Sequence, residues 1–239
     1  MKYLYGITDA PKGISIDRRG LGDGPVTVVH HREVGAVVGP ADEPRYRPEL
    51  DNLKAHEEVL ETVMELHTVL PVRFSTVFSD DEAVFALLEE RYDQFRSDLS
   101  RLRGMVELGV KALWRSGPSP GESGGPRDEA SGDACEALSP GRRYLARRIQ
   151  EVQRERLRFQ EAEDLAREIH RPLSEVAVDT SFSVHPAPRI VFSGAYLVER
   201  DHAPLFRGLA EKIRAQTPEV IFLISGPWPP YSFVSDVKR

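Results

Sequence analysis

The order of secondary-structure patterns in the second half of the chain restricts the possible fold most strongly. Apolar residues alternate over Met105–Trp114, as in a strand that buries one face. The following patterns are helix (142–170), strand (175–184), strand (189–198), helix (204–216) and a short apolar strand (220–225). The predicted order, β-α-β-β-α-β, is that of a ferredoxin-like unit, in which two helices cover one face of a four-stranded antiparallel sheet.

The first half of the chain predicts a second, smaller α+β unit. Strand-like segments occur at 2–8, 26–31, 34–38 and 68–74, and helical spacing of apolar residues separates the last two, over 49–67. The resulting order is β-β-β-α-β, a small sheet packed on one helix. A further helical pattern, with an acidic start at 80–82, runs to about residue 102.

These patterns divide the chain into two predicted domains. We expect an N-terminal domain over 1–78, a helical connector over 79–103 and a C-terminal domain over 104–239. Residues 115–141 are rich in glycine and proline and almost free of aromatic residues. Such a segment cannot bury enough apolar area to offset its chain entropy, so we predict a flexible insertion there.

Composition and charge exclude several classes of protein. The formal net charge of -6 opposes a general affinity for nucleic acid or anionic membranes. The single cysteine, Cys135, cannot form an internal disulfide, which suits a reducing compartment. Polar residues come too early for a secretory signal, and no apolar run approaches the ~20 residues of a membrane span. We therefore predict a cytoplasmic protein without a membrane span.

No motif in the sequence predicts catalysis, a cofactor or a metal ion. His56-Glu57 would begin a zinc-protease motif, but Leu60 stands where the second histidine should be. His56 and His67 could share a helix face, yet two histidines without a third ligand make a poor zinc site. The glycine-rich stretch 20–24 precedes no helix that could receive a phosphate, so a turn is the better interpretation. We predict no catalytic, cofactor-binding or metal-binding residues, and no enzyme activity.

An aromatic and proline-rich segment near the C-terminus is the main candidate for a binding site. Its candidate contact residues are Trp228, Pro229, Pro230, Tyr231 and Phe233. Prolines fix the backbone, and aromatic rings offer large apolar faces at low entropic cost. The segment could equally fold back and cap the core of the protein itself, and the sequence leaves both readings open.

The arginines of 142–158 supply an alternative function. A ferredoxin-like module could use this face to bind RNA. However, Glu151 and Glu155 lie among the arginines, and no aromatic RNA-binding motif is present. A mixed-charge face is more typical of a solvated helix with internal ion pairs.

Several segments resemble the gas vesicle protein F/L family, in a shared order along nearly the whole chain. They are Tyr3-Leu4-Tyr5-Gly6-Ile7, Ala55-His56-Glu57 with Val59-Leu60-Glu61, and the stretches 67–74, 107–114 and 226–233. One departure is Ser75, where the resemblance leads us to expect glycine after Pro-Val-Arg-Phe. This leaves the turn after Phe74 undefined.

The resemblance implies an accessory or minor structural protein of gas vesicles. It implies a variant ferredoxin-like N-terminal domain, a ferredoxin-like C-terminal domain with long helices, and no cofactor. The implied partners are the gas vesicle shell protein, during vesicle nucleation, and other gas vesicle accessory proteins. A shell subunit must expose apolar surface to build a water-excluding wall, so a partner that covers this surface before assembly would prevent aggregation.

Overall fold

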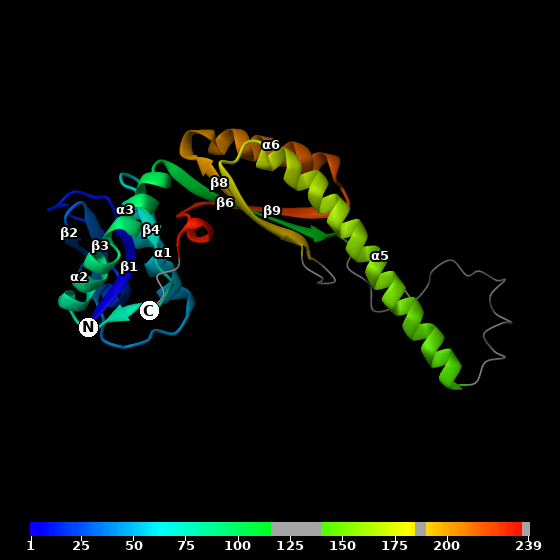
Figure 1. The fold of residues 1–239 in the computed structure, drawn as a ribbon, viewed down its shortest axis with the longest axis horizontal. Coiled ribbons are helices and arrows are strands. Elements are labelled where there is room, and N and C mark those ends of the chain that lie inside the picture. The colour runs from blue at the N-terminus through cyan, green and yellow to red at the C-terminus, as the bar shows by residue number, and fades with distance from the viewer. Residues whose placement is uncertain (116–139, 185–189, 236–239) are drawn as a thin grey trace. The chain divides into compact units, whose positions relative to one another are not determined.

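The computed structural model describes residues 1–115, 140–184 and 190–235, which form a mixed α+β protein as predicted (Figure 1). The chain divides into two compact units. The first unit contains Met1–Leu108, Leu197–Ala203 and Ser225–Arg239, and the second contains Gly109–Tyr196 and Pro204–Ile224.

The first unit is built on an antiparallel sheet in the order β2-β3-β1-β4, with β5 also paired to β1. The strands are β1 (Lys2–Thr8), β2 (Thr27–His31), β3 (Val34–Pro40), β4 (Val69–Pro71) and β5 (Val77–Phe78). The two-residue β5 was not predicted, because so short a strand carries no periodic signal. β1 and β3 are buried along almost their whole length, so both faces of the sheet are covered.

Three helices and a short 3₁₀ turn complete this part of the fold. They are α1 (Leu50–Met64), α2 (Asp81–Glu90), α3 (Tyr92–Arg101) and η1 (Leu21–Asp23). Buried residues of α1 recur at helical spacing: His56, Val59, Leu60, Val63 and Met64. The side chain of Asp80 accepts a 2.8 Å hydrogen bond from the Ala83 amide, which satisfies one free donor at the start of α2.

The predicted domain boundaries differ from the compact units. Helices α2 and α3, predicted as a connector, contact β2 and β3 and belong to the first unit. Residues from Ser225 onward, predicted as part of the C-terminal domain, also belong to the first unit. The periodicity of a segment shows that it has a buried face but does not show which surface covers that face. Of the predicted insertion, residues 116–139, including Cys135, lie outside the described residues.

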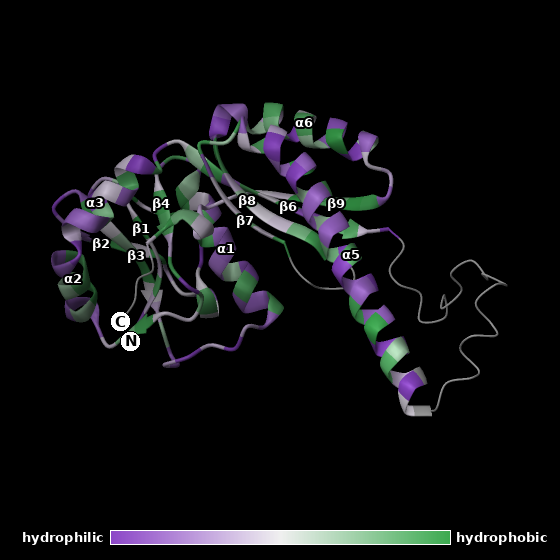
Figure 2. Ribbon diagram, turned by 45° about the vertical axis from the view of Figure 1, so that its right-hand side comes forward, coloured by the Kyte–Doolittle hydropathy of each residue, from purple (hydrophilic) through white to green (hydrophobic). Residues whose placement is uncertain are grey.

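The second sheet has the strand order β7-β8-β6-β9 and the predicted β-α-β-β-α-β element order. The elements of this half of the chain are β6 (Met105–Trp114), α5 (Pro140–Ser174), β7 (Asp179–Val184), β8 (Ile190–Glu199), α6 (Ala203–Gln216) and β9 (Val220–Trp228). The short turns η2 (Arg200–His202) and η3 (Tyr231–Phe233) belong to the first unit. Both long helices lie on the same face of the sheet (Figures 1 and 2). Alternate residues of β6, from Val106 to Ala112, are fully buried, as the pattern predicted.

An apolar stripe along α5 is buried over only part of its length. Ala162, Ala166, Ile169 and Leu173 are at most 4% exposed. The earlier members of the stripe, from Leu145 to Phe159, are exposed, because α5 extends beyond the strands of its own sheet (Figure 1). Within the described residues, every helix is too short or too polar to serve as a membrane span.

Gly6 allows β1 to approach its neighbours closely. The register between β1 and β3 shifts between Leu4 and Gly6, which is typical of a β-bulge. A Cβ atom at Gly6 would lie 2.8 Å from the Leu70 carbonyl oxygen on β4, and backbone atoms cannot move aside as a flexible side chain can.

We expect Gly6→Ala to lower the free energy of unfolding by ~1–3 kcal/mol, the usual cost of overpacking. The matched control is Gly208→Ala, in α6, where an added Cβ meets nothing within 4 Å. This control should be neutral or stabilising by up to ~1 kcal/mol, because alanine is the better helix former. Urea unfolding of both variants measures the difference, and equal effects would contradict the close approach.

Candidate functional site

The aromatic and proline-rich segment begins in β9 and ends in the short turn η3. Its five candidate residues differ in exposure. Pro229, Pro230 and Phe233 are buried, Tyr231 is partly buried, and Trp228 is 37% exposed. The segment therefore has a buried part, as the core-capping interpretation predicts, and one exposed aromatic residue. Contact of these five residues with a partner stays a prediction.

Hydrogen bonds fix the segment to distant parts of the first unit. The Tyr231 hydroxyl donates to Glu57 Oε1 on α1 at 2.9 Å. The Ser232 amide and hydroxyl donate to the two carboxylate oxygens of Glu107 on β6, at 2.7 and 2.8 Å. The Arg101 guanidinium donates to the Phe233 carbonyl oxygen. These contacts bind each of the three residues of η3, so the segment is part of the folded first unit.

Burial changes the acidity of both carboxylates in this attachment. It raises the pKa of Glu57, and the hydrogen bond from Tyr231 opposes that shift in part. Burial likewise raises the pKa of Glu107, against the opposing effect of the two Ser232 bonds. Burial also raises the pKa of Tyr231, and the nearby Glu57 raises it further. Because the second oxygen of Glu57 is buried without a hydrogen-bond partner in the described structure, its charge is poorly solvated.

His56 lies in an aromatic cluster between α1 and β1. It is only 1% exposed, so it belongs to the core. Its ring stacks on Tyr5 at 5.6 Å between centroids and meets the edges of the Tyr3 and Phe74 rings. Its position three and four residues before Val59 and Leu60 places it on the buried face of α1.

Tyr3 supplies the hydrogen-bond partner of one ring nitrogen of His56. The Tyr3 oxygen accepts a 2.9 Å bond from the Ser75 amide and lies 3.0 Å from His56 Nδ1. The hydroxyl has one hydrogen and two acceptor lone pairs, so it can bond Nδ1 while it accepts from Ser75. Burial lowers the pKa of His56 to about 4, while the Val72 backbone acts in the opposite direction. The ring is neutral at neutral pH and has a structural role.

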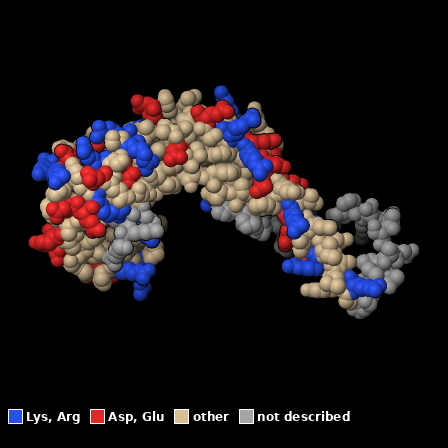
Figure 3. All heavy atoms as spheres, viewed as in Figure 1, with Lys and Arg blue, Asp and Glu red and all other residues tan. Residues whose placement is uncertain are grey.

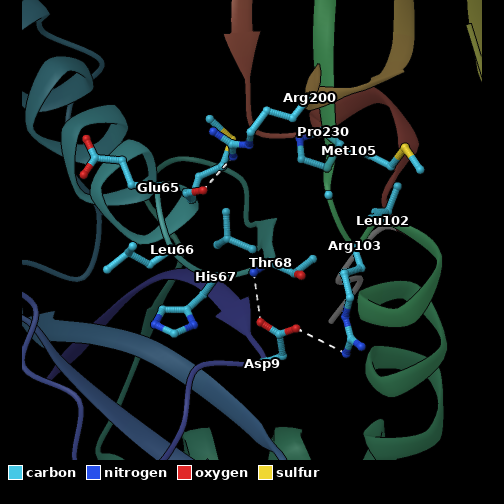
Figure 4. A pocket seen from close by; sticks show the side chains of 13 residues that line it. Asp9, Glu65, Leu66, His67, Thr68, Leu102, Arg103, Met105, Arg200 and Pro230 are labelled. Carbon is cyan, nitrogen blue, oxygen red and sulfur yellow. Dashed lines mark hydrogen bonds and ion pairs between the residues drawn. The ribbon is translucent and has the colours of Figure 1, made fainter. Parts of the chain in front are cut away.

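A pocket of about 290 Å³ in the first unit is lined in part by Pro230 of the segment (Figure 4). Asp9 accepts a 2.9 Å bond from the Thr68 amide and forms a 3.4 Å ion pair with Arg103. Arg200 donates to the Met64 carbonyl oxygen at 2.6 Å. These side chains thus bind other groups of the protein, which is typical of structural contacts.

The histidines of the sequence do not converge. His67 lines the pocket, whereas His56 lies in the aromatic cluster. On β2, His30 bonds the Ala10 carbonyl oxygen at 2.9 Å, and His31 packs on Phe85 of α2. Among the described residues, no three His, Cys, Asp or Glu side chains are grouped closely enough to hold a metal ion.

Three arginines of α5 are seen to form ion pairs within the helix. Arg147 and Arg148 both contact Glu151, at 3.7 and 3.2 Å. Arg167 contacts Glu163 and Asp164 in the same way. Such pairs at helical spacing are typical of a solvated face. They add no support to RNA binding, which stays an untested alternative.

The sequence pattern of the family described as "Gas vesicle synthesis protein GvpL/GvpF" matches residues 1–235. The chain belongs to the GvpL/GvpF family. It is 33% identical to gas vesicle protein L of Streptomyces sp. (strain CB03234), over 98% of this chain and 92% of the relative. It is 31% identical to gas vesicle protein F of the same strain, over 97% of this chain and 98% of the relative. Its role therefore lies in gas vesicle synthesis, the process for which the family is named.

Solved structures of GvpL/GvpF proteins share the fold. The crystal structure of GvpF from Anabaena sp. PCC7120 superimposes with a TM-score of 0.80 at 22% identity, over 99% of this chain and 97% of that one. GvpF from Microcystis aeruginosa gives a TM-score of 0.75 at 24% identity, over 98% of both chains. At these identities the likeness concerns the fold alone.

Sequence reasoning missed the residues of this GvpL/GvpF protein that hold the C-terminal segment. Glu57, Arg101 and Glu107 are ordinary charged residues of helices and a strand by sequence. Their role depends on contacts with residues that are distant in the sequence. The contacts of Arg101 and Glu57 each span at least 132 positions, and that of Glu107 spans 125. The only local sign concerns Glu107. It stands at an odd-numbered position of β6, on the face of the strand opposite to the buried even-numbered positions.

We expect acid to destabilise the protein through His56. Its folded-state pKa lies below the unfolded value, so its contribution to stability is present above about pH 6.5 and is lost as the pH falls toward 4. The full contribution is about 3 kcal/mol. The unfolding free energy of His56→Gln, measured in urea, should vary less with pH across this window. The exposed His202→Gln is the control and should retain the wild-type dependence; equal slopes for wild type and His56→Gln would contradict the prediction.

We expect Glu107→Ala to loosen the C-terminal segment. The change removes both hydrogen bonds of Ser232 to the carboxylate, and because Ser232 is exposed the cost is that of the lost bonds, ~0.5–1.5 kcal/mol each. Amide hydrogen exchange at 231–233 should therefore become faster, while exchange in α1 stays slow. Ser232→Ala is the matched control, because it removes only the hydroxyl contact and keeps the amide bond to Glu107. Unchanged exchange in Glu107→Ala would show that the carboxylate does not hold the segment.

Proposed function

We propose that this GvpL/GvpF protein binds the hydrophobic shell subunit of the gas vesicle during nucleation, and that it acts in the cytoplasm and at the growing vesicle. Membership of the family supports a role in gas vesicle synthesis. A subunit that builds a water-excluding wall exposes apolar surface before assembly, and such surface aggregates unless a partner covers it. Other gas vesicle accessory proteins are further partners in this proposal.

The exposure of Trp228 is the observation that supports the proposal most. Its indole is 37% exposed, although the next two residues are buried and the turn that follows is held by Glu57 and Glu107. The backbone beneath the indole is therefore ordered before any partner arrives. A rigid aromatic side chain loses little entropy on binding, and tryptophan is enriched among the residues that dominate binding energy.

The burial of the neighbouring residues makes Trp228 the appropriate position to test. Phe233 is only 8% exposed, so its replacement would damage the core of the first unit as well as any binding surface. The buried Pro229 and Pro230 have the same drawback. In the proposed mechanism these residues and Tyr231 support the position of the indole, and Trp228 makes the main contact with the shell subunit.

We expect Trp228→Ala to weaken binding of the shell subunit at least ~10-fold, the usual loss at a dominant aromatic contact. The measurement is co-expression with the shell subunit, followed by size exclusion with mass detection. Leu50→Ala is the matched control, since Leu50 is 79% exposed in the same unit and far from the segment in sequence. Both variants should retain the wild-type melting temperature to within a few degrees, because each truncates a partly exposed side chain.

Two outcomes would contradict this proposal at different levels. If the wild-type protein leaves the shell subunit as insoluble as it is alone, direct binding is wrong. If wild type forms a soluble complex and Trp228→Ala forms it equally well, binding is correct but Trp228 is not the contact.

A further inference from the structure

The N-terminal half of α5 carries an apolar stripe that the described residues leave uncovered. Its members are Leu145, Ile149, Val152 and Phe159, which are 59%, 56%, 37% and 37% exposed. Ala166 and Leu173, which lie seven and fourteen residues after Phe159, are fully buried. One continuous stripe therefore packs inside the second unit at its C-terminal end and is open at its N-terminal end. Figure 2 shows hydrophobic colour recurring along this open half of the helix.

The spacing of the stripe is that of a surface that pairs with another helix. Its steps of four, three and seven residues follow the heptad repeat, in which every seventh position returns to the same seam. From Leu145 to Phe159 the stripe is ~21 Å long, at 1.5 Å per residue. Arg156 occupies the seam position between Val152 and Phe159. The stripe is thus narrow and interrupted by a charge, whereas a membrane-surface helix presents a broad apolar face.

The charge around the stripe is strongly positive. Residues 142–158 contain seven arginines and two glutamates, a net formal charge of +5 in a chain whose total is -6. Arg147 and Arg148 share one carboxylate, that of Glu151. Among the described residues, no carboxylate lies in ion-pair contact with Arg154, Arg156 or Arg158. Figure 3 shows blue arginine side chains beside uncharged surface along this part of α5.

From these observations we propose that residues 144–159 of α5 dock an acidic amphipathic α-helix of a partner protein. The apolar side of that helix lies on the stripe, and its flanking Asp or Glu side chains meet the arginines. A second copy of this chain would place two segments of charge +5 against each other, which electrostatic repulsion opposes. Single-stranded RNA would use the arginines but leave the four apolar side chains exposed to water. This inference goes beyond the proposed shell-subunit contact and does not depend on it.

The direct test uses two designed helical peptides as probes. Both have leucine at the a and d positions of three heptads; one has glutamate at the flanking positions and the other has lysine. Fluorescence anisotropy with the full-length protein should show binding of the glutamate peptide at least ~10-fold tighter than binding of the lysine peptide. The preference should shrink as the salt rises from ~50 to ~300 mM, because salt screens the exposed charges.

Variants on two faces of the same helix locate the contact. Leu145→Ser with Ile149→Ser should weaken binding of the glutamate peptide at least ~10-fold. Leu157→Ser is the matched control: Leu157 is 59% exposed, the same as Leu145, but lies ~120° around the helix from it. Arg156→Glu tests the charge without removing an apolar group. It should greatly reduce the preference for the glutamate peptide over the lysine peptide, and it provides a test even if the double variant folds poorly.

Several results would overturn the proposal. Equal binding of the two peptides, or no binding of either, would remove the charge-matched helix as the occupant. A loss in Leu157→Ser as large as in the double variant would mean that the stripe is not the contact. If wild type self-associates in sedimentation and the double variant does not, the stripe binds a second copy instead. If the stripe variants abolish binding to vesicles that contain anionic lipid, its occupant is a membrane surface.

Discussion

The fold of the first unit depends on β1 having partners along both of its edges. β3 pairs with one edge, and β4 and β5 share the other. Because both edges of this strand are paired and both faces are buried, water reaches neither its backbone nor its side chains. Each side chain must therefore find its partners inside the protein. Tyr3 and Tyr5 do so through their hydroxyls, which accept the amide hydrogens of Ser75 and Leu21. The connection between β1 and β2 and the loop after β4 are thereby attached to the centre of the sheet.

The same constraint explains an unexpected residue. Ser75 has φ of +67°, a left-handed conformation that favours glycine, and glycine is what the family resemblance led us to expect. The serine side chain offsets this cost, because its hydroxyl accepts the Tyr46 amide at 2.8 Å while its own amide donates to Tyr3. The turn after Phe74 is therefore held by two hydrogen bonds that glycine could not both make.

Sequence periodicity predicted most elements because it records which side of a segment is buried. β6 and α6 were found within a residue of their observed bounds, and the ferredoxin-like element order of the second half followed from them. Periodicity failed where the structure depends on distant contacts or on short elements. It could not show that α2 and α3 pack within the first unit, that His56 is buried against Tyr3, or that η3 is held by Glu57 and Glu107. At the candidate site, composition identified the aromatic segment, but only burial distinguished Trp228 from its neighbours.

The path of the chain through the first unit has a consequence for its synthesis. That unit draws on Met1–Leu108, on Leu197–Ala203 and on residues from Ser225 onward, so its pieces leave the ribosome at widely separated times. Domains usually fold in order as they leave the ribosome, beginning at the N-terminus. Here the sheet around β1 can form early, but Glu57, Arg101 and Glu107 gain their partners in η3 only after the whole second unit has been translated.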